Sequence, residues 1–149
     1  MKKFKFRLQR VLDYRNSVKK DKERELALKN ALLHAAEHRL EEIIDEQDGV
    51  ELPTNGEMTM AELQLTREYQ QYLQDALVEQ RLTVLEAASA VEAARDAYIE
   101  KAIEAETLET LRKKKQLEHR DERRREERKE LNDLTVQRHR FKKNPGDES

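Results

Sequence analysis

The sequence predicts an all-α protein in which two long helices fold back on each other as an antiparallel coiled-coil hairpin. Charged residues make up 42% of its 149 residues and hydrophobic residues only 36%, too little to fill a globular core of this length. The helix-breaking glycines and prolines fall in only two places, residues 49–56 and 145–146. A disordered chain has no reason to confine its breakers in this way. An elongated helical rod, whose core is only a thin seam between helices, therefore explains the composition better.

The first helix is expected at about residues 4–47, and a hinge at about 48–58 follows it. The second helix is expected at about 59–141, because Thr59 and Glu62 form the T-x-x-E capping box typical of a helix start. A polar tail at 142–149 completes what we expect to be a single coiled-coil domain. The breakers of the hinge are Gly49, Pro53 and Gly56.

A heptad repeat predicts which residues face the seam between the helices. Basic residues interrupt the apolar pattern of the first helix, and alanines in both helices allow close approach. The inward positions of the first helix are Leu8, Leu12, Arg15, Lys19, Lys22, Leu26, Lys29, Leu33, Ala36, Leu40 and Ile43. Those of the second are Leu63, Thr66, Gln70, Leu73, Leu77, Gln80, Val84, Ala87, Val91, Ala94, Tyr98 and Ala105 to Leu108.

The second helix is too long for the first to cover it. Folding back at the hinge places Phe4 opposite about residue 102, since a short connection makes neighbouring helices antiparallel. The apolar pattern stops at Leu108, and Leu117 is the only apolar residue from Arg112 to Glu130. The last part of the second helix is therefore expected to overhang as a charged single helix.

Charge is strongly segregated along the chain. Residues 1–24 carry ten basic and three acidic residues, residues 37–109 carry five and nineteen, and residues 110–149 carry fourteen and nine. The hairpin therefore gathers both basic segments at the end away from the hinge. A solvated surface, a nucleic-acid arm and a docking site for an acidic protein partner are the three interpretations of this tip.

Docking to a protein is the interpretation that the neighbouring residues favour. The segment "RDERRREERKE" alternates in sign and has no aromatic residues, which disfavours nucleic acid. Apolar side chains within a basic surface are what a helix needs to bind a groove or collar. These apolar residues are Phe4, Phe6, Leu8, Val11 and Leu12 near the start, and Leu131, Leu134 and Phe141 near the end.

A second candidate surface lies near the hinge. Tyr69 and Tyr72 stand out on a chain that otherwise avoids aromatic residues. Packing of Leu73 in the seam, with the tyrosines covering its flank, is the alternative. The stripe consists of Tyr69, Leu73, Ala76 and Gln80, with Arg39 and Ile43 roughly opposite.

The segment "HAAEH" at residues 34–38 fits the H-x-x-E-H pattern of zinc peptidases. In the heptad frame, His34 and His38 fall on outward positions, and two helices offer no third ligand or cleft. We therefore expect a solvated helix face and no metal, cofactor or catalytic site. His119 and His139 are interpreted in the same way.

The chain contains no cysteine, which fits a reducing cytoplasm. Charges throughout "MKKFKFRLQRVLDYR" exclude a signal-peptide pattern, and no segment is apolar enough to span a bilayer. Any membrane contact is expected to be peripheral.

Three segments resemble the FliJ family, a coiled-coil component of the bacterial flagellar export apparatus. "FKFRLQRVLDYR" resembles its F-x-F-x-L-x-x-V-L start, and "EYQQYLQDALVEQRLTVLEAASAVEAARDAY" is similar to its central segment. "ETLETLRKKKQLEHRDERRREERKELNDL" resembles its leucine-bounded, charged element. The segment "NDLTVQRHR" departs from the family, which more usually has an acidic pair and an alanine there.

The resemblance implies a non-enzymatic protein similar to the central stalk of rotary ATPases. Its implied partners are the hexameric export ATPase FliI at the tip, the export gate protein FlhA and export chaperones, on the cytoplasmic face of the inner membrane. The expected ATPase contacts are Phe4, Phe6, Arg7, Leu8, Arg10, Arg123, Arg124, Arg125 and Arg128. The expected gate contacts are Arg39, Ile43, Tyr69, Leu73, Ala76 and Gln80.

Three alternatives differ in what they predict. The equivalent stalk of a virulence-type secretion system is separated from a flagellar stalk by genome neighbourhood. A plain structural tether predicts a parallel or higher oligomer, whereas the hairpin predicts an elongated monomer. A metalloenzyme predicts stoichiometric zinc and an activity that His34→Ala abolishes.

Overall fold

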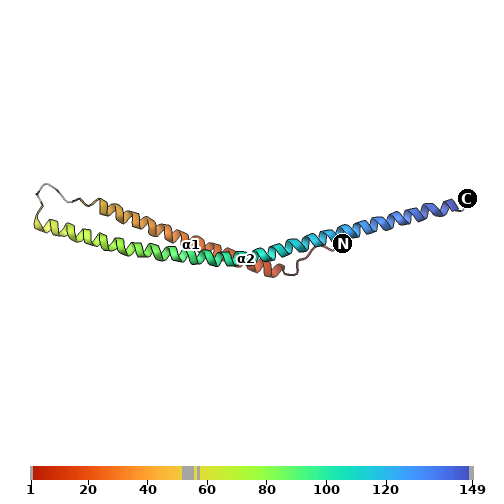
Figure 1. The fold of residues 1–149 in the computed structure, drawn as a ribbon, viewed down its shortest axis with the longest axis horizontal. Helices are drawn as coiled ribbons and strands as arrows, with labels where there is room; N and C mark the ends of the chain where they lie inside the picture. The colour runs from red at the N-terminus through yellow and green to blue at the C-terminus, as the bar shows by residue number, and fades with distance from the viewer. Residues whose placement is uncertain (1, 52–55, 57, 148–149) are drawn as a thin grey trace. The chain divides into compact units, whose positions relative to one another are not determined.

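The computed structural model describes residues 2–51, 56 and 58–147, with side chains as far as residue 142. All regular secondary structure in these residues is helical, with α1 at Gln9–Asp48 and α2 at Met60–Asp147. The two helices pack against each other, which confirms the predicted all-α hairpin (Figure 1). Contacts divide the chain into two units, residues 17–102 and residues 1–16 with 103–149, and each is described by itself.

In the unit formed by residues 17–102, a narrow apolar seam joins α1 and α2. Every inward position that the heptad frame predicts in this unit is buried or half-buried. Leu73 is only 1% exposed, and removing such a side chain from water stabilises the fold by about 1.5–3 kcal/mol. The buried residues of this unit are Ala36, Ile43, Leu73, Leu77 and Val91.

Two hydrogen bonds across the seam show that the helices are antiparallel. The Gln80 side chain donates to the Ala36 carbonyl oxygen at 2.9 Å, and the Gln47 side chain donates to that of Gln74 at 2.9 Å. The predicted register is wrong, because it places Gln47 opposite about residue 59. The prediction assumed that the end of α1 and the start of α2 lie level with each other. In the structure, the first turns of α2, from Met60, extend beyond the end of α1 at Asp48.

The capping box at the start of α2 is confirmed. The Glu62 backbone N–H donates to Thr59 Oγ1 at 3.2 Å, and the Thr59 backbone N–H donates to Glu62 Oε2 at 3.3 Å. These reciprocal bonds satisfy donors that the first turn leaves without helical partners. At the other side of the hinge, Gly49 donates to the Asp45 carbonyl at 3.0 Å and closes α1. Pro53, the third expected breaker besides Gly49 and Gly56, lies outside the described residues.

The other unit contains the first turns of α1 beside the C-terminal half of α2. Leu12 and Ala105 are buried in its seam, and Arg15 donates a hydrogen bond to the Glu104 carboxylate. The α1 helix begins at Gln9 rather than Phe4, because a run of lysine and arginine is unfavourable at the positive end of a helix dipole.

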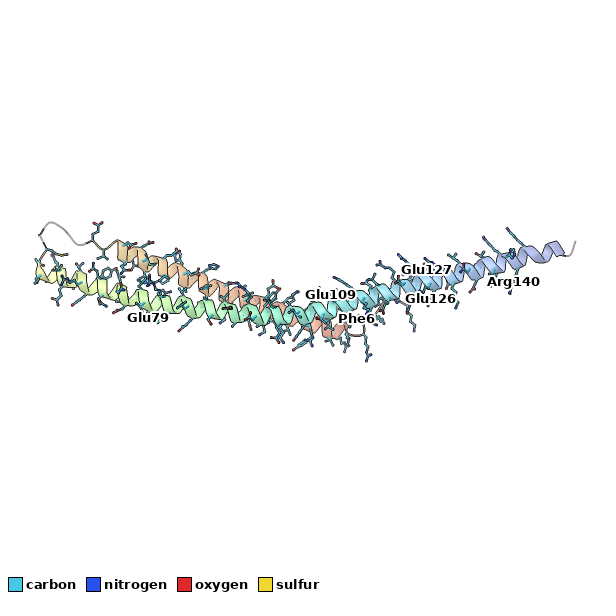
Figure 2. All side chains as sticks on the ribbon, viewed as in Figure 1. Phe6, Glu79, Glu109, Glu126, Glu127 and Arg140 are labelled. Atoms are coloured by element: carbon cyan, nitrogen blue, oxygen red, sulfur yellow. The ribbon has the colours of Figure 1, made fainter. Side chains whose placement is uncertain are left out.

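The far part of α2 forms a single exposed helix within this unit, as predicted. Residues 120–142 are all exposed. In Figure 2, no other described segment runs beside the helix at Glu127 and Arg140. The helix continues to Asp147 rather than ending at Phe141, since exposed helix ends are not fixed by packing.

Candidate partner-binding surfaces

The first candidate surface is built from the N-terminal segment, residues 2–8, which we call the strap. Its residues 2–6 belong to no helix, and the backbone N–H of Gln9 donates to the Phe6 carbonyl at 3.1 Å as the chain turns into α1. Phe4, Phe6 and Leu8 are half-buried, whereas the basic residues between them are exposed. The alternation of basic and apolar residues therefore turns one side of an extended segment toward the protein and the other toward solvent.

The strap lies against α2. The ring centroids of Phe4 and His119 are 5.6 Å apart, and Figure 2 shows Phe6 beside α2 between the levels of Glu109 and Glu126. The prediction placed Phe4 opposite about residue 102. It also interpreted His119 as part of a solvated face, whereas His119 is half-buried. Both predictions are wrong, because the register of the hairpin places the start of the chain level with a later part of α2 than expected, where Phe4 covers His119.

An open groove of about 1350 Å³ lies between the strap and α2 and is lined by residues of both. From α2, Glu118, Glu122 and Glu126 line it, and we call these three residues the acidic stripe. Their spacing of four residues keeps them on one face of a helix. The remaining residues that line the groove are Lys2, Lys3, Phe4, Lys5, Phe6, Arg7, Leu8, Leu111, Lys115 and His119.

Not all of the expected ATPase contacts share one surface. Arg123 lines a hollow together with Lys2, Lys3 and Phe4, and it also pairs with Glu127 at 3.4 Å. The three consecutive arginines 123–125 point in different directions, since successive residues are about 100° apart around a helix. Arg10, Arg124, Arg125 and Arg128 are exposed and line neither the groove nor this hollow.

A small apolar patch follows on the single-helix part of α2. Leu134 and Phe141 are 58% and 81% exposed, and with Arg138 and Lys142 they line a shallow hollow. Leu134, Arg138 and Phe141 are spaced as one helix face. The apolar residues that the sequence singled out near the C-terminus thus lie in the open.

The expected gate contact near the hinge is only partly accessible. Leu73 and Ile43 are 1% and 3% exposed, so each fills the seam and offers no surface to a partner. Ala76 and Gln80 are half-buried, and Gln80 is bonded to α1. Tyr69 is exposed.

Of the expected gate contacts, Tyr69 and Arg39 are exposed, and the exposed Tyr72 lies beside Tyr69. The rings of Tyr69 and Tyr72 are stacked with centroids 6.5 Å apart, and Tyr72 is 65% exposed. Arg39 of α1 is exposed and pairs with Glu42 at 3.1 Å and Glu46 at 3.7 Å. The accessible residues of the expected gate contact are therefore Arg39 and Tyr69, and Tyr72 completes a tyrosine pair with Tyr69.

A further apolar stripe was missed in the sequence. Val78, Leu82 and Leu85 are all more than half exposed and follow one another at helical spacing. They are neither in the predicted seam nor in the tyrosine stripe. The signal that reveals them is a second apolar periodicity, offset by one residue from Leu77 and Val84 of the seam.

His34 and His38 lie on the outer face of α1, as predicted. Their side chains are 78% and 73% exposed, and each lies near a carboxylate of its own helix, Glu37 at 3.7 Å and Glu42 at 3.2 Å. His139 is exposed as well. In the described part of the chain, no group of three or more His, Cys, Asp or Glu side chains is arranged to hold a metal ion.

A comparison with known protein families identifies the family of this chain. The model of the family described as flagellar FliJ protein matches residues 4–144. The chain belongs to the FliJ family. A FliJ-family protein is a component of the flagellar export apparatus, and this part of the role that the resemblance implied is confirmed. Searches of curated proteins and of solved structures gave no match.

The match covers the candidate surfaces described above. The strap, the acidic stripe and the tyrosine pair all fall within residues 4–144, apart from the first lysines. Across the residues that the structure describes, neither helix is long and apolar enough to cross a membrane.

Proposed function

We propose that this protein is a stalk-like subunit that binds the hexameric export ATPase FliI and connects it to the export gate protein FlhA. It has no chemistry of its own. It favours assembly or turnover of the ATPase ring by binding one arrangement of the ring better than others. We place it on the cytoplasmic face of the inner membrane at the flagellar base, where export chaperones are further partners.

The observation that carries the ATPase contact is the composition of the strap and the adjoining part of α2. Phe4, Phe6 and Leu8 provide apolar surface, and exposed basic residues surround them. A basic surface attracts an acidic collar at long range, and buried aromatic side chains then supply most of the binding free energy. The exposed arginines of α2 steer the encounter rather than form its centre.

For the gate contact, the exposed tyrosines are the better candidates than the buried part of the stripe. Aromatic residues with large accessible area are enriched among those that dominate binding. Tyr69, Tyr72 and Arg39 contact the gate directly in this proposal. Ile43 and Leu73 support them from the seam. If Tyr69→Ala combined with Tyr72→Ala left FlhA binding unchanged, while Val78→Ala with Leu82→Ala abolished it, the placement would be wrong.

ATP hydrolysis by the export ATPase from the same genome tests the main proposal. The full chain is expected to stimulate hydrolysis and ring assembly, and a chain without residues 1–12 is expected to do neither. Because that deletion removes the buried Leu12, a milder variant is needed. Lys5, Arg7 and Arg10, all exposed, are changed to glutamine together.

A matched control has the same change of charge elsewhere. Arg67, Arg81 and Arg95 are exposed on α2 and lie outside the strap and its groove. Changing these three to glutamine is expected to leave stimulation intact. Equal stimulation by both triple variants and the parent protein would show that the basic strap does not bind the ATPase.

A further inference from the structure

The strap and the acidic stripe form an unusual pairing within the C-terminal half of α2. Residues 110–149 are basic overall, yet three carboxylates of α2 line the same groove as the four basic residues of the strap. On the same helix, His119 contacts the Phe4 ring, and Leu111 lines the groove together with the apolar residues of the strap. This face of α2 therefore matches an extended segment in which basic and aromatic residues alternate.

Weak forces hold the strap against this face of α2. No ion pair joins the described strap residues to the acidic stripe, and Glu118 pairs instead with Lys115 at 3.3 Å. The charges attract one another across solvent, over distances that salt screens within about 8 Å. The strap has no helical hydrogen bonds of its own at residues 2–6, so its release breaks few bonds.

We propose that this face of α2, which carries Leu111, His119 and the acidic stripe, is a docking site for the strap, which lies against it reversibly in the free protein. This inference rests on the proposed function in one respect. Phe4, Phe6, Arg7 and Leu8 are the residues assigned to the ATPase contact, so the ATPase must take them away from α2. The docked strap is thus an internal competitor that weakens binding at the tip, and its release exposes the acidic stripe.

Cross-linking in the full chain measures docking without any partner. Lys3 and Gln116 line one hollow, and the chain has no cysteine of its own. Lys3→Cys with Gln116→Cys is expected to react rapidly with a short bifunctional maleimide. Lys3→Cys with Gln137→Cys is the control, because Gln137 lies about 30 Å further along the helix. Equal reaction of the two pairs would overturn docking.

Charge variants test the role of the acidic stripe. Changing Glu118, Glu122 and Glu126 to glutamine is expected to lower the cross-linking rate about threefold or more, since each exposed charge pair contributes only a fraction of a kcal/mol. A control triple change of Glu106, Glu130 and Asp133, which are exposed and lie outside the groove and the hollow, is expected to leave the rate unchanged. An unchanged rate in the first variant would refute the stripe as the docking site.

A synthetic peptide of residues 2–8 tests whether the groove accepts a segment in trans. It is expected to slow cross-linking at about millimolar concentration, the effective concentration of a segment tethered by a short linker. The same peptide with serine in place of both phenylalanines retains the charge and is expected to compete much less. Equal competition by both peptides would show charge attraction without a specific groove.

ATPase binding by the cross-linked and the unreacted protein then tests competition. The cross-linked form is expected to bind at least about tenfold more weakly, because its strap cannot leave the groove. Equal binding by both forms would overturn the inference. Absence of binding by either form would instead contradict the proposed function. The cross-linking rates would then still test whether the strap docks on α2.

Discussion

The side-chain amide of Gln80 lies 2.9 Å from the carbonyl oxygen of Ala36, 44 positions away in the sequence. Ala36 is 8% exposed and faces the seam. Because its side chain is a single methyl group, the backbone of α1 comes close enough to α2 to accept this bond. Ala36, a small and weakly hydrophobic residue, thus helps to fix the register of the hairpin.

Ala36→Leu is expected to destabilise the protein. The larger side chain separates the helices and breaks the Gln80 bond, with a cost of about 1–3 kcal/mol typical of overpacked cores. Urea denaturation followed by circular dichroism measures the change. Ala35→Leu is the control, since Ala35 is exposed on the same turn and is expected to change stability by less than about 0.5 kcal/mol. A neutral effect of Ala36→Leu would show that the seam is loose at this point.

Leu73→Ala and Tyr72→Ala are expected to have opposite effects on stability and on FlhA binding. Leu73 is buried, and its truncation costs about 2–5 kcal/mol of stability, whereas Tyr72 is exposed and its truncation costs little. FlhA binding at a temperature where both variants are folded separates the two roles. We expect Tyr72→Ala to weaken it and Leu73→Ala to leave it nearly unchanged. The reverse pattern would mean that the hairpin opens when it binds the gate.

Changing Arg124, Arg125 and Arg128 to glutamine is expected to affect binding without affecting stability. These residues are exposed on the single-helix part of α2. We expect association with the ATPase to slow by roughly tenfold at low salt, and the difference to shrink as salt screens the charges. Stopped-flow measurements at two salt concentrations provide the test, and the Arg67, Arg81 and Arg95 variant is the control. A difference independent of salt would contradict a steering role.

Amide hydrogen exchange is expected to divide α2 into two parts. Amides of residues 74–108 are protected because α1 covers the seam, whereas those of residues 120–142 exchange much faster because single helices open readily. Mass spectrometry of the free protein measures both. Addition of the ATPase is expected to protect the second part only. Uniform protection along the free helix would show that the overhang is held by contacts with another molecule, such as a second copy.

Much of the fold follows from periodicity. The heptad frame predicts the inward face of both helices, including charged positions such as Lys19 and Lys22, which are half-buried as expected for seam residues. The capping box locates the start of α2 because its two hydrogen bonds are local. The register depends instead on how the hinge is folded, and no local pattern encodes that. The start of α1 was misplaced because alternating basic and aromatic residues suit an extended segment as well as a helix.

The candidate sites were harder to predict. Leu73 and Ile43 satisfied both the seam pattern and the stripe assigned to the gate, but a residue that fills the seam has no surface left for a partner. His119 was interpreted as solvated because its own helix turn is charged. Its actual neighbour, Phe4, is distant in sequence and lies on a segment without helical periodicity. A contact of that kind requires the register, which the sequence does not reveal.

The basic residues in the seam of α1 have a consequence for the chain during synthesis. Arg15, Lys19, Lys22 and Lys29 are half-buried, and the register places them level with a part of α2 that is rich in alanine. Alanines leave room for the long side chains, whereas a second copy of α1 in parallel would place each lysine against itself. On a polysome, where α1 leaves the ribosome first and many identical segments are close together, we expect this repulsion to keep neighbouring nascent chains apart until each has made its own α2.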